Sequence, residues 1–243
     1  MRNDFSAALA AAERDMGGRG IGTLGEKTLH LALKYYVAPD PETHERPLGR
    51  FIADAVTEDG VFEIQTRGLA RLKPKLDEFL PLCPVTVVFP VITQKQLYRV
   101  DESGTVISER KSPKHESVYT AMREIYALRD YQARPGFRVL LCLIELAEYS
   151  VVHGSSRREK LDRVPLALQD AMILESKADY AAFLPAELPE PITSPALAKA
   201  VHTTELCARL YLNLLGKMGV LAESGRIGRY KGWKRTVLCG IRG

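Results

Sequence analysis

Two acidic residues and a glutamine stand at a spacing that suits metal-dependent phosphodiester chemistry. Eight residues separate Asp54 from Glu63, and Gln65 follows Glu63 after one more residue. Carboxylates are hard oxygen ligands of the kind that Mg²⁺ prefers, and this ion typically takes only one or two of them from a protein. A bound divalent cation lowers the pKa of a water molecule and stabilises negative charge on a phosphoryl group. These residues therefore indicate phosphodiester hydrolysis, with Mg²⁺ as cofactor and Mn²⁺ as a substitute.

The residues around the acids predict a β-hairpin that would bring them together. Residues 48–67 have the pattern of two strands, and Asp59-Gly60 between them is a strong hairpin signal. A two-residue turn places Asp54 opposite Gln65 and diagonal to Glu63, whereas a four-residue turn places Asp54 directly opposite Glu63. An odd loop would put the two acids on opposite faces. Carboxylates exposed at a solvated sheet end are the ordinary alternative.

This arrangement resembles the signature of the PD-(D/E)xK nuclease superfamily, in which an acid on one strand is followed by an acid-x-lysine triplet on the next. The resemblance covers residues 20–150 and implies a restriction-endonuclease-like core, similar also to Holliday-junction resolvases. It implies that Asp54, Glu63 and the Ile64 carbonyl hold the metal and that Gln65 orients the attacking water. Gln65 replaces the usual lysine, as in a minority of restriction-type enzymes, and it cannot supply positive charge.

A glutamate on the helix before the hairpin belongs to the same resemblance. Glu26 shares a helical stripe with Leu29, His30 and Leu33 that would face the sheet, and the superfamily places a catalytic glutamate on this helix. The segment from Thr23 to Glu26 also fits a capping box, in which Glu26 bonds the Thr23 backbone. Both roles stay open and do not exclude each other. His30 is interpreted as a structural histidine.

Helices and strands alternate around the hairpin and predict an α/β fold, with a mixed central sheet flanked by helices. The run PVTVVFPVI at 84–92 is continuously apolar and β-branched, which is typical of a strand buried on both faces. Residues 154–163 are interpreted as a basic loop. Further strands are expected within 48–67 and at 96–100, 105–109 and 137–152, and helices at 6–14, 23–37, 70–80 and 116–128.

Prolines between residues 184 and 195 interrupt every periodic pattern and divide the chain. We expect a nuclease-like domain over 1–185 and a second, smaller domain over 190–243. The second domain begins with helices at 195–201 and 204–218 and ends in two strand-like pieces joined by a basic loop. It resembles a winged helix-turn-helix domain, which would place its second helix in the major groove of DNA and its wing on the DNA backbone.

Basic side chains follow the acidic triplet and concentrate in the second domain, although a net charge of +4 does not by itself establish nucleic-acid binding. Contacts of arginine and lysine with phosphates give affinity but little sequence choice. The candidates for nucleic-acid binding are Arg67, Arg157, Arg158, Lys160, Arg209, Asn213, Lys217, Arg229, Lys231 and Lys234.

The sequence thus predicts a metal-dependent DNA endonuclease to which a winged helix delivers the substrate, with RNA left open and a homodimer compatible. One alternative, supported by Gln65, is a DNA-binding regulator with a catalytically silent nuclease-like domain. Another is a protein-binding component of a defence or repair complex. The four cysteines form no C-x-x-C pair and no segment is long enough to cross a bilayer, so we expect a cytoplasmic protein.

Overall fold

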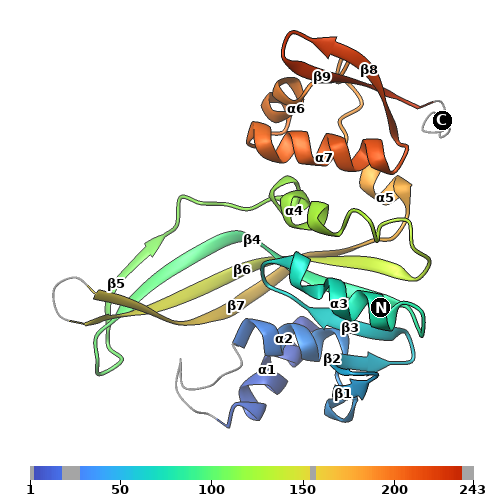
Figure 1. The fold of residues 1–243 in the computed structure, drawn as a ribbon. Coiled ribbons are helices and arrows are strands. Elements are labelled where there is room, and N and C mark those ends of the chain that lie inside the picture. Colours follow the sequence, from blue (N-terminus) through green and yellow to red (C-terminus); the bar gives the residue numbers. More distant parts are fainter. Residues whose placement is uncertain (1–2, 18–27, 154–156, 237–243) are drawn as a thin grey trace.

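The computed structural model describes residues 3–17, 28–153 and 157–236, without the side chains of residues 152, 153, 157 and 158. Within this part of the chain, a seven-stranded mixed sheet forms the centre and helices pack on both of its faces (Figure 1). The mixed α/β class expected from the sequence is confirmed. None of the described helices is long and apolar enough to cross a membrane.

Helices and strands alternate along most of the chain. The helices are α1 (Phe5–Asp15), α2 (Thr28–Val37), α3 (Lys73–Phe79), α4 (Val118–Ile125), α5 (Lys177–Ala181), α6 (Ser194–Ala200) and α7 (Glu205–Lys217), with 3-10 turns η1 (Pro41–Thr43), η2 (Leu69–Leu72) and η3 (Tyr126–Leu128). The strands are β1 (His44–Leu48), β2 (Phe51–Thr57), β3 (Gly60–Ile64), β4 (Val85–Val100), β5 (Val106–Lys111), β6 (Phe137–His153), β7 (Arg157–Leu174), β8 (Leu221–Ile227) and β9 (Tyr230–Arg235).

The main sheet has the order β1-β2-β3-β4-β6-β7, and β5 pairs with residues 96–100 of β4. Strands β1, β2 and β3 form an antiparallel meander because short turns join them. Strand β4 is parallel to β3 and to β6, since α3 and α4 lie in the connections between them. Strand β7 returns antiparallel to β6 and forms one edge of the sheet.

Alternating side chains of the central strands build one apolar cluster on each face of the sheet. Val87 of β4 and Val139 of β6 pack with α3, α4 and α7, whereas Val88 and Cys142 pack with α1 and α2. Residues 85–92 are buried throughout, and the half-exposed part of β4 follows them. The prediction of a strand buried on both faces at 84–92 is therefore confirmed, although β4 continues without a break through the second strand expected at 96–100.

The long edge strand β7 corrects the prediction of a basic loop at 154–163. From residue 157 onward the backbone pairs with β6 as far as Leu174. The many charged side chains gave this segment no strand pattern in the sequence. An edge strand is held by backbone hydrogen bonds and need not carry an apolar run. Lys160 is therefore a strand residue, and its ammonium pairs with Glu148 of β6.

The C-terminal part places α6 and α7 beside the β8–β9 hairpin. Ile192 forms an isolated antiparallel bridge with Trp233 of β9, beside this two-stranded sheet. The Trp233 ring lies against α7 at Gly216, where an added Cβ atom would come within 2.2 Å of the ring. Trp233 is thus a packing residue.

One apolar cluster runs from the main sheet into the C-terminal part. Leu141 of β6, Met122 of α4, Tyr211 of α7 and Trp233 all belong to it, and Ile192 is itself fully buried. The proline-rich stretch at 184–195 therefore interrupts the secondary structure but not the hydrophobic core.

Candidate active site

The β2–β3 hairpin brings the two sequence-predicted acids to the same level of the sheet. Val56 pairs with Val61 and Thr57 pairs with Gly60 across a turn of Glu58 and Asp59. Gly60 has a φ of 111°, and a Cβ atom there would lie 2.3 Å from the Pro84 carbonyl oxygen, so this position requires glycine. The pairing of Val56 with Val61 is the register expected for a turn over residues 57–60, and it brings Asp54 and Glu63, each one residue beyond the last pair, to the same level of the hairpin.

The ladder between β2 and β3 ends just before the acids. Its last pair is Ala55 with Phe62, and beyond it Oδ2 of Asp54 accepts a hydrogen bond of 2.7 Å from the Ile64 N–H. A side-chain carboxylate here takes the N–H that a regular ladder would give to a carbonyl oxygen. Asp54 is thereby held at the edge of β3, next to the triplet that contains Glu63.

Asp54 also meets a histidine from the helix layer. His30 on α2 places its Nε2 atom 3.5 Å from Oδ2 of Asp54, and the two side chains are 25% and 16% exposed. Burial acts to raise the pKa of Asp54, but the contacts with His30 and the Ile64 N–H outweigh it and lower this pKa below its usual value. Asp54 is therefore ionised at neutral pH and fixed in position.

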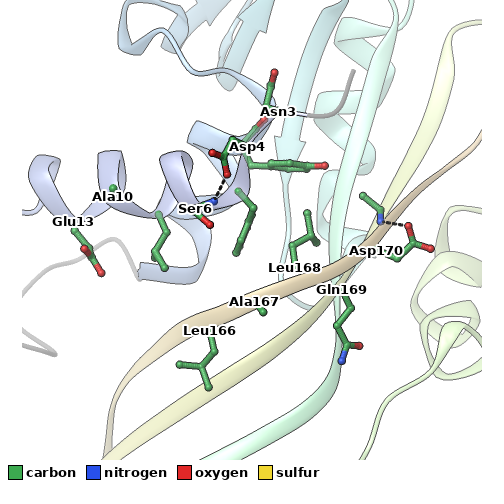
Figure 2. A pocket seen from close by; sticks show the side chains of 14 residues that line it. Asn3, Asp4, Ser6, Ala10, Glu13, Leu166, Ala167, Leu168, Gln169 and Asp170 are labelled. Carbon is green, nitrogen blue, oxygen red and sulfur yellow. Dashed lines mark hydrogen bonds between the residues drawn. The ribbon is translucent and has the colours of Figure 1, made fainter.

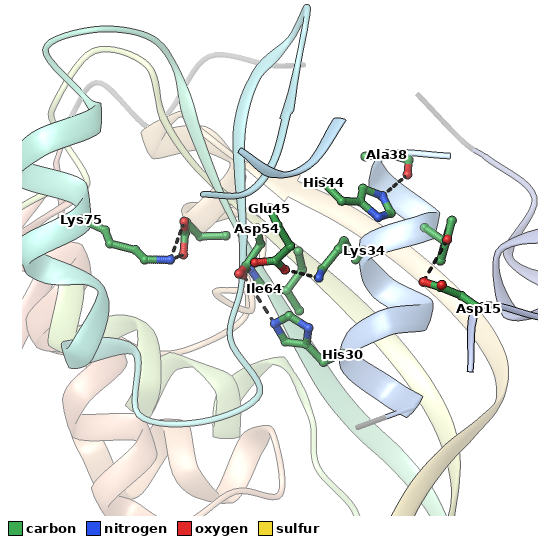
Figure 3. A network of polar contacts seen from close by, with 11 residues as sticks. Asp15, His30, Lys34, Ala38, His44, Glu45, Asp54, Ile64 and Lys75 are labelled. Carbon is green, nitrogen blue, oxygen red and sulfur yellow. Dashed lines mark hydrogen bonds and ion pairs between the residues drawn. The ribbon is translucent and has the colours of Figure 1, made fainter. Parts of the chain in front are cut away.

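Glu63 points to the opposite helix layer, where it meets a lysine. Its side chain is only 1% exposed, and Nζ of Lys75 on α3 lies 2.8 and 3.0 Å from the two carboxylate oxygens. Burial and the negative charge of Asp54 raise the pKa of Glu63 to about 7, even though Lys75 opposes this. Figure 3 shows Lys75 approaching the strands from one side and His30 from the other.

Gln65 turns away from the carboxylates. Its amide donates a hydrogen bond of 2.5 Å to the backbone carbonyl of Arg67, so it does not point at Glu63 or Asp54. The side chain that brings positive charge to the triplet is Lys75, which the sequence shows only as one of several basic residues after the hairpin. The ion pair of Lys75 with Glu63 depends on how α3 packs across the sheet.

The acidic pair presents few possible ligands to a divalent cation. Among the described residues, no three His, Cys, Asp or Glu side chains form a group that could hold a metal ion. Two carboxylates and a carbonyl are nevertheless sufficient for Mg²⁺, which keeps several of its waters. The ammonium of Lys75 on both oxygens of Glu63 indicates that this buried carboxylate attracts a cation. Glu26 lies outside the described residues.

A second ion pair extends the polar network along α2. Lys34 is buried and its ammonium bonds the Glu45 carboxylate of β1 (Figure 3). Glu45 has a positive φ of 49°, a conformation that costs free energy for a residue with a side chain. Nearby, Nε2 of His44 lies 2.7 Å from the Ala38 carbonyl oxygen. These contacts anchor β1 to α2 beside the acidic pair.

A basic groove lies between α7 and the β8–β9 hairpin. It has a volume of about 470 Å³, and its lining includes Glu205 and Trp233. Four sequence-predicted contact residues line it, together with a further arginine and a tyrosine: Arg209, Asn213, Arg229, Lys231, Arg226 and Tyr230. The guanidinium of Arg229 stacks on the Tyr230 ring at 5.0 Å.

The remaining sequence-predicted contact residues lie elsewhere. Lys217 pairs with Asp130 near α4 and does not line the basic groove. Lys234 is exposed on β9, and Arg67 is exposed directly after the acidic triplet. The side chains of Arg157 and Arg158 lie outside the described residues.

A second groove, of about 550 Å³, lies between α1 and the edge strand β7 (Figure 2). The residues that line it include Asp4, Glu13 and Asp170 and no lysine or arginine. Asp4 and Asp170 already accept hydrogen bonds from the backbone N–H groups of Ser6 and Ala171. The three carboxylates of this groove repel phosphates.

Comparison with known proteins gives one family and one relative. A family model described as a domain of unknown function, DUF8091, matches residues 27–177, which include the acidic pair and most of the main sheet. An uncharacterized protein from Treponema pallidum (strain Nichols) is 33% identical over 221 residues, covering 88% of this chain and 87% of its own. No solved structure matches the chain.

Proposed function

The chain belongs to the DUF8091 family, and from the geometry of its acidic pair we propose that it is a metal-dependent nuclease that hydrolyses phosphodiester bonds of DNA. The observation that carries this proposal is the placement of Asp54 and Glu63 on adjacent strands. Asp54 is bonded to the backbone of the Glu63-Ile64-Gln65 triplet itself. Two carboxylates meeting in a partly buried place repel each other unless a cation offsets their charge.

The order of elements supports the same proposal. Helix α2, the antiparallel meander β1-β2-β3, helix α3 and the parallel strand β4 follow one another along the chain. A helix, a hairpin that carries the acids, a second helix and a buried strand are the context in which the superfamily resemblance places its site. The proposed fold is accordingly a restriction-endonuclease-like core.

The C-terminal part supports a role in delivering the substrate. The order expected of a winged helix is present here: helix α5, the isolated bridge at Ile192, helices α6 and α7 and the β8–β9 hairpin. The basic groove between α7 and the hairpin offers three arginines to phosphate groups, and Lys231 of the same groove pairs with Glu223 at 2.8 Å. We propose that this part binds duplex DNA.

The residues of the acidic site have separable roles in the proposed reaction. Asp54 and Glu63, with the Ile64 carbonyl, would hold Mg²⁺, which when bound supplies an activated water and stabilises phosphoryl charge. His30 and the Ile64 N–H hold one oxygen of Asp54 and fix its carboxylate in advance. Lys75 supplies the positive charge that Gln65 lacks, and Arg67 is exposed at the point where a phosphate would approach.

A cleavage assay tests the proposed nuclease activity. The full chain is incubated with labelled duplex, single-stranded and branched DNA, in Mg²⁺ or in EDTA. We expect cleavage of at least one substrate in Mg²⁺ and none in EDTA. Asp54→Asn should abolish cleavage and leave DNA binding intact, whereas Asp59→Asn makes the same chemical change in the hairpin turn and should cut normally. Cleavage by Asp54→Asn at the wild-type rate would contradict the assignment.

A second candidate is a DNA-binding protein whose nuclease-like domain does not cut. Two observations favour it: Lys75 already neutralises Glu63, and Gln65 bonds the Arg67 carbonyl rather than facing the acids. In the same assay this protein would bind DNA in a salt-dependent manner but cut none of the substrates in Mg²⁺.

A further inference from the structure

Arg163 on β7 carries a hydrogen-bond donor without a partner among the described residues. This donor is the Nε atom, which is buried. The backbone at this position is nevertheless well fixed, because the Arg163 N–H donates to Oδ1 of Asp162 at 2.7 Å. Asp162 in turn accepts hydrogen bonds from the backbone and hydroxyl of Thr28, at the start of α2. An anchored arginine with an unused donor is a place where an acceptor is expected from outside the described protein.

The carboxylates near Arg163 already bond other groups. Glu148 lies across from Arg163 in the β6–β7 register, but its carboxylate bonds Lys95 at 3.1 Å and Lys160 at 3.3 Å. Glu116 gives one carboxylate oxygen to the Ile92 N–H at 2.9 Å. Neither acid forms an ion pair with Arg163 in the part of the chain that the structure describes.

A second arginine adds to the positive charge at this place. Burial lowers the pKa of Arg163, Glu148 and Glu116 act to raise it again, and the charge of Arg67 lowers it further. The positive charge of Arg67 is therefore one of the charges that act on Arg163. An anion between the two guanidinium groups would offset both charges and supply the missing acceptor.

The arginine pair adjoins the acidic site. The carbonyl of Arg67 accepts the hydrogen bond from Gln65, the last residue of the triplet that contains Glu63. Strand β7 is tied to the same site through α2 (Figure 1), because Thr28 at the start of α2 bonds Asp162 and His30, two residues later, contacts Asp54. A nucleic-acid strand whose scissile phosphate lay at Asp54 and Glu63 would thus bring a neighbouring phosphate to this pair.

We propose that Arg67 and Arg163 form a binding site for a backbone phosphate of the nucleic acid, next to the acidic pair. This inference rests on the proposed function for the identity of its ligand. The planar guanidinium group matches the phosphate oxygens and can bond them in pairs, which an ammonium cannot do. The site contributes affinity and holds the strand in register, whereas the groove at α7 binds a separate part of the substrate.

Binding measured in EDTA separates this inference from cleavage. The affinity of the full chain for a short fluorescent DNA duplex is determined by anisotropy at several salt concentrations. Each phosphate contact with duplex DNA contributes about 0.9 to the slope of log affinity against log salt. Arg163→Met keeps the buried stem and removes the charge, and should weaken binding about tenfold and reduce this slope by about one. Arg67→Ala, at an exposed position, should do the same.

Two further variants sharpen the result. Arg46→Ala removes one exposed cation from β1, at the opposite edge of the sheet, and should leave the slope unchanged. Arg163→Lys keeps the charge, so its slope should match the wild type while its affinity is reduced.

A wild-type slope in both Arg163→Met and Arg67→Ala, or the absence of DNA binding by the wild type, would overturn the proposal. Removal of the Arg163 effect by inorganic phosphate at constant ionic strength would also overturn it, in favour of a free-phosphate site. A lack of Mg²⁺-dependent cleavage would contradict the proposed nuclease activity and not this phosphate site, because binding is measured in EDTA.

Discussion

At the scale of single residues, Glu63 is the group of the acidic site whose pKa is shifted most. It is nearly inaccessible, it lies beside a second carboxylate, and one lysine compensates its charge. The spacing of Asp54 and Glu63 in the sequence was sufficient to predict their common level on the hairpin. It could not predict Lys75 as the partner or the turn of Gln65 towards Arg67, because both depend on how α3 and the following loop pack on the sheet.

The raised pKa of Glu63 predicts a specific dependence of stability on pH. In the metal-free protein its pKa rises from 4.5 to about 7 on folding, so the protonated form is favoured in the folded state. Its contribution to stability is therefore fully present below pH 4.5 and is lost as the pH rises through 7. Relative to Glu63→Gln, the wild type should lose about 2–3 kcal/mol of unfolding free energy between these limits. Urea unfolding in EDTA measures this, and parallel pH profiles for the two proteins would contradict it.

The Lys75–Glu63 pair predicts a strong coupling between its two members. Lys75→Met leaves a buried carboxylate without a counter-charge and should cost about 2–3 kcal/mol of stability at pH 8. The double variant Lys75→Met, Glu63→Gln should recover most of this loss, because no uncompensated charge is left. Thermal or urea unfolding of the four proteins gives the coupling energy. Additive losses in the double variant would show that the pair does not interact as described.

At the scale of elements, local signals predicted the hairpin and the buried strand, and they failed at β7. Asp59-Gly60 marked the turn because Gly60 must adopt a positive φ close to the Pro84 carbonyl. Residues 84–92 were recognisable because their apolar side chains face both helix layers. Strand β7 has no such signature: its first residues are charged and Pro165 interrupts its pattern, so only pairing with β6 makes it a strand.

The contact between α7 and the β8–β9 hairpin gives a test at this scale. Alanine has a higher helix propensity than glycine, and at an unconstrained helix position Gly→Ala would stabilise by up to about 1 kcal/mol. At Gly216 the added methyl group meets the Trp233 ring, so Gly216→Ala should instead destabilise by about 1–3 kcal/mol. In a Trp233→Leu background the same substitution should cost much less. A stabilising effect of Gly216→Ala in the otherwise unchanged chain would show that the ring does not pack there.

At the scale of the whole molecule, the mixed sheet with helices on both faces followed from the sequence, and the continuity of the core did not. The prolines at 184–195 suggested separate domains because they break local structure. Packing of α7 against α4 joins the two parts through Tyr119 and Tyr211, whose rings lie 5.9 Å apart. Contacts between residues this distant in sequence leave no periodic signal.

The shared core predicts that the first 185 residues are not self-sufficient. Ending the chain there removes α7 and exposes the apolar surface of α4 and α5 that α7 covers. The shortened protein should unfold without a sharp transition and bind a hydrophobic dye such as ANS, whereas the full chain should unfold in one cooperative step. Cooperative unfolding of the shortened chain at the temperature of the full chain would contradict the shared core.

The central claim is that Asp54 and Glu63 together hold a divalent cation, and cation binding tests it most directly. Titration of Mn²⁺ into the DNA-free protein, followed by electron paramagnetic resonance of the free ion, should show one site in the wild type and in Asp59→Asn. That site should be lost in Asp54→Asn and in Glu63→Gln, and Mg²⁺ should compete for it. Equal Mn²⁺ binding by the wild type and Asp54→Asn, or none by any of these proteins, would contradict the account.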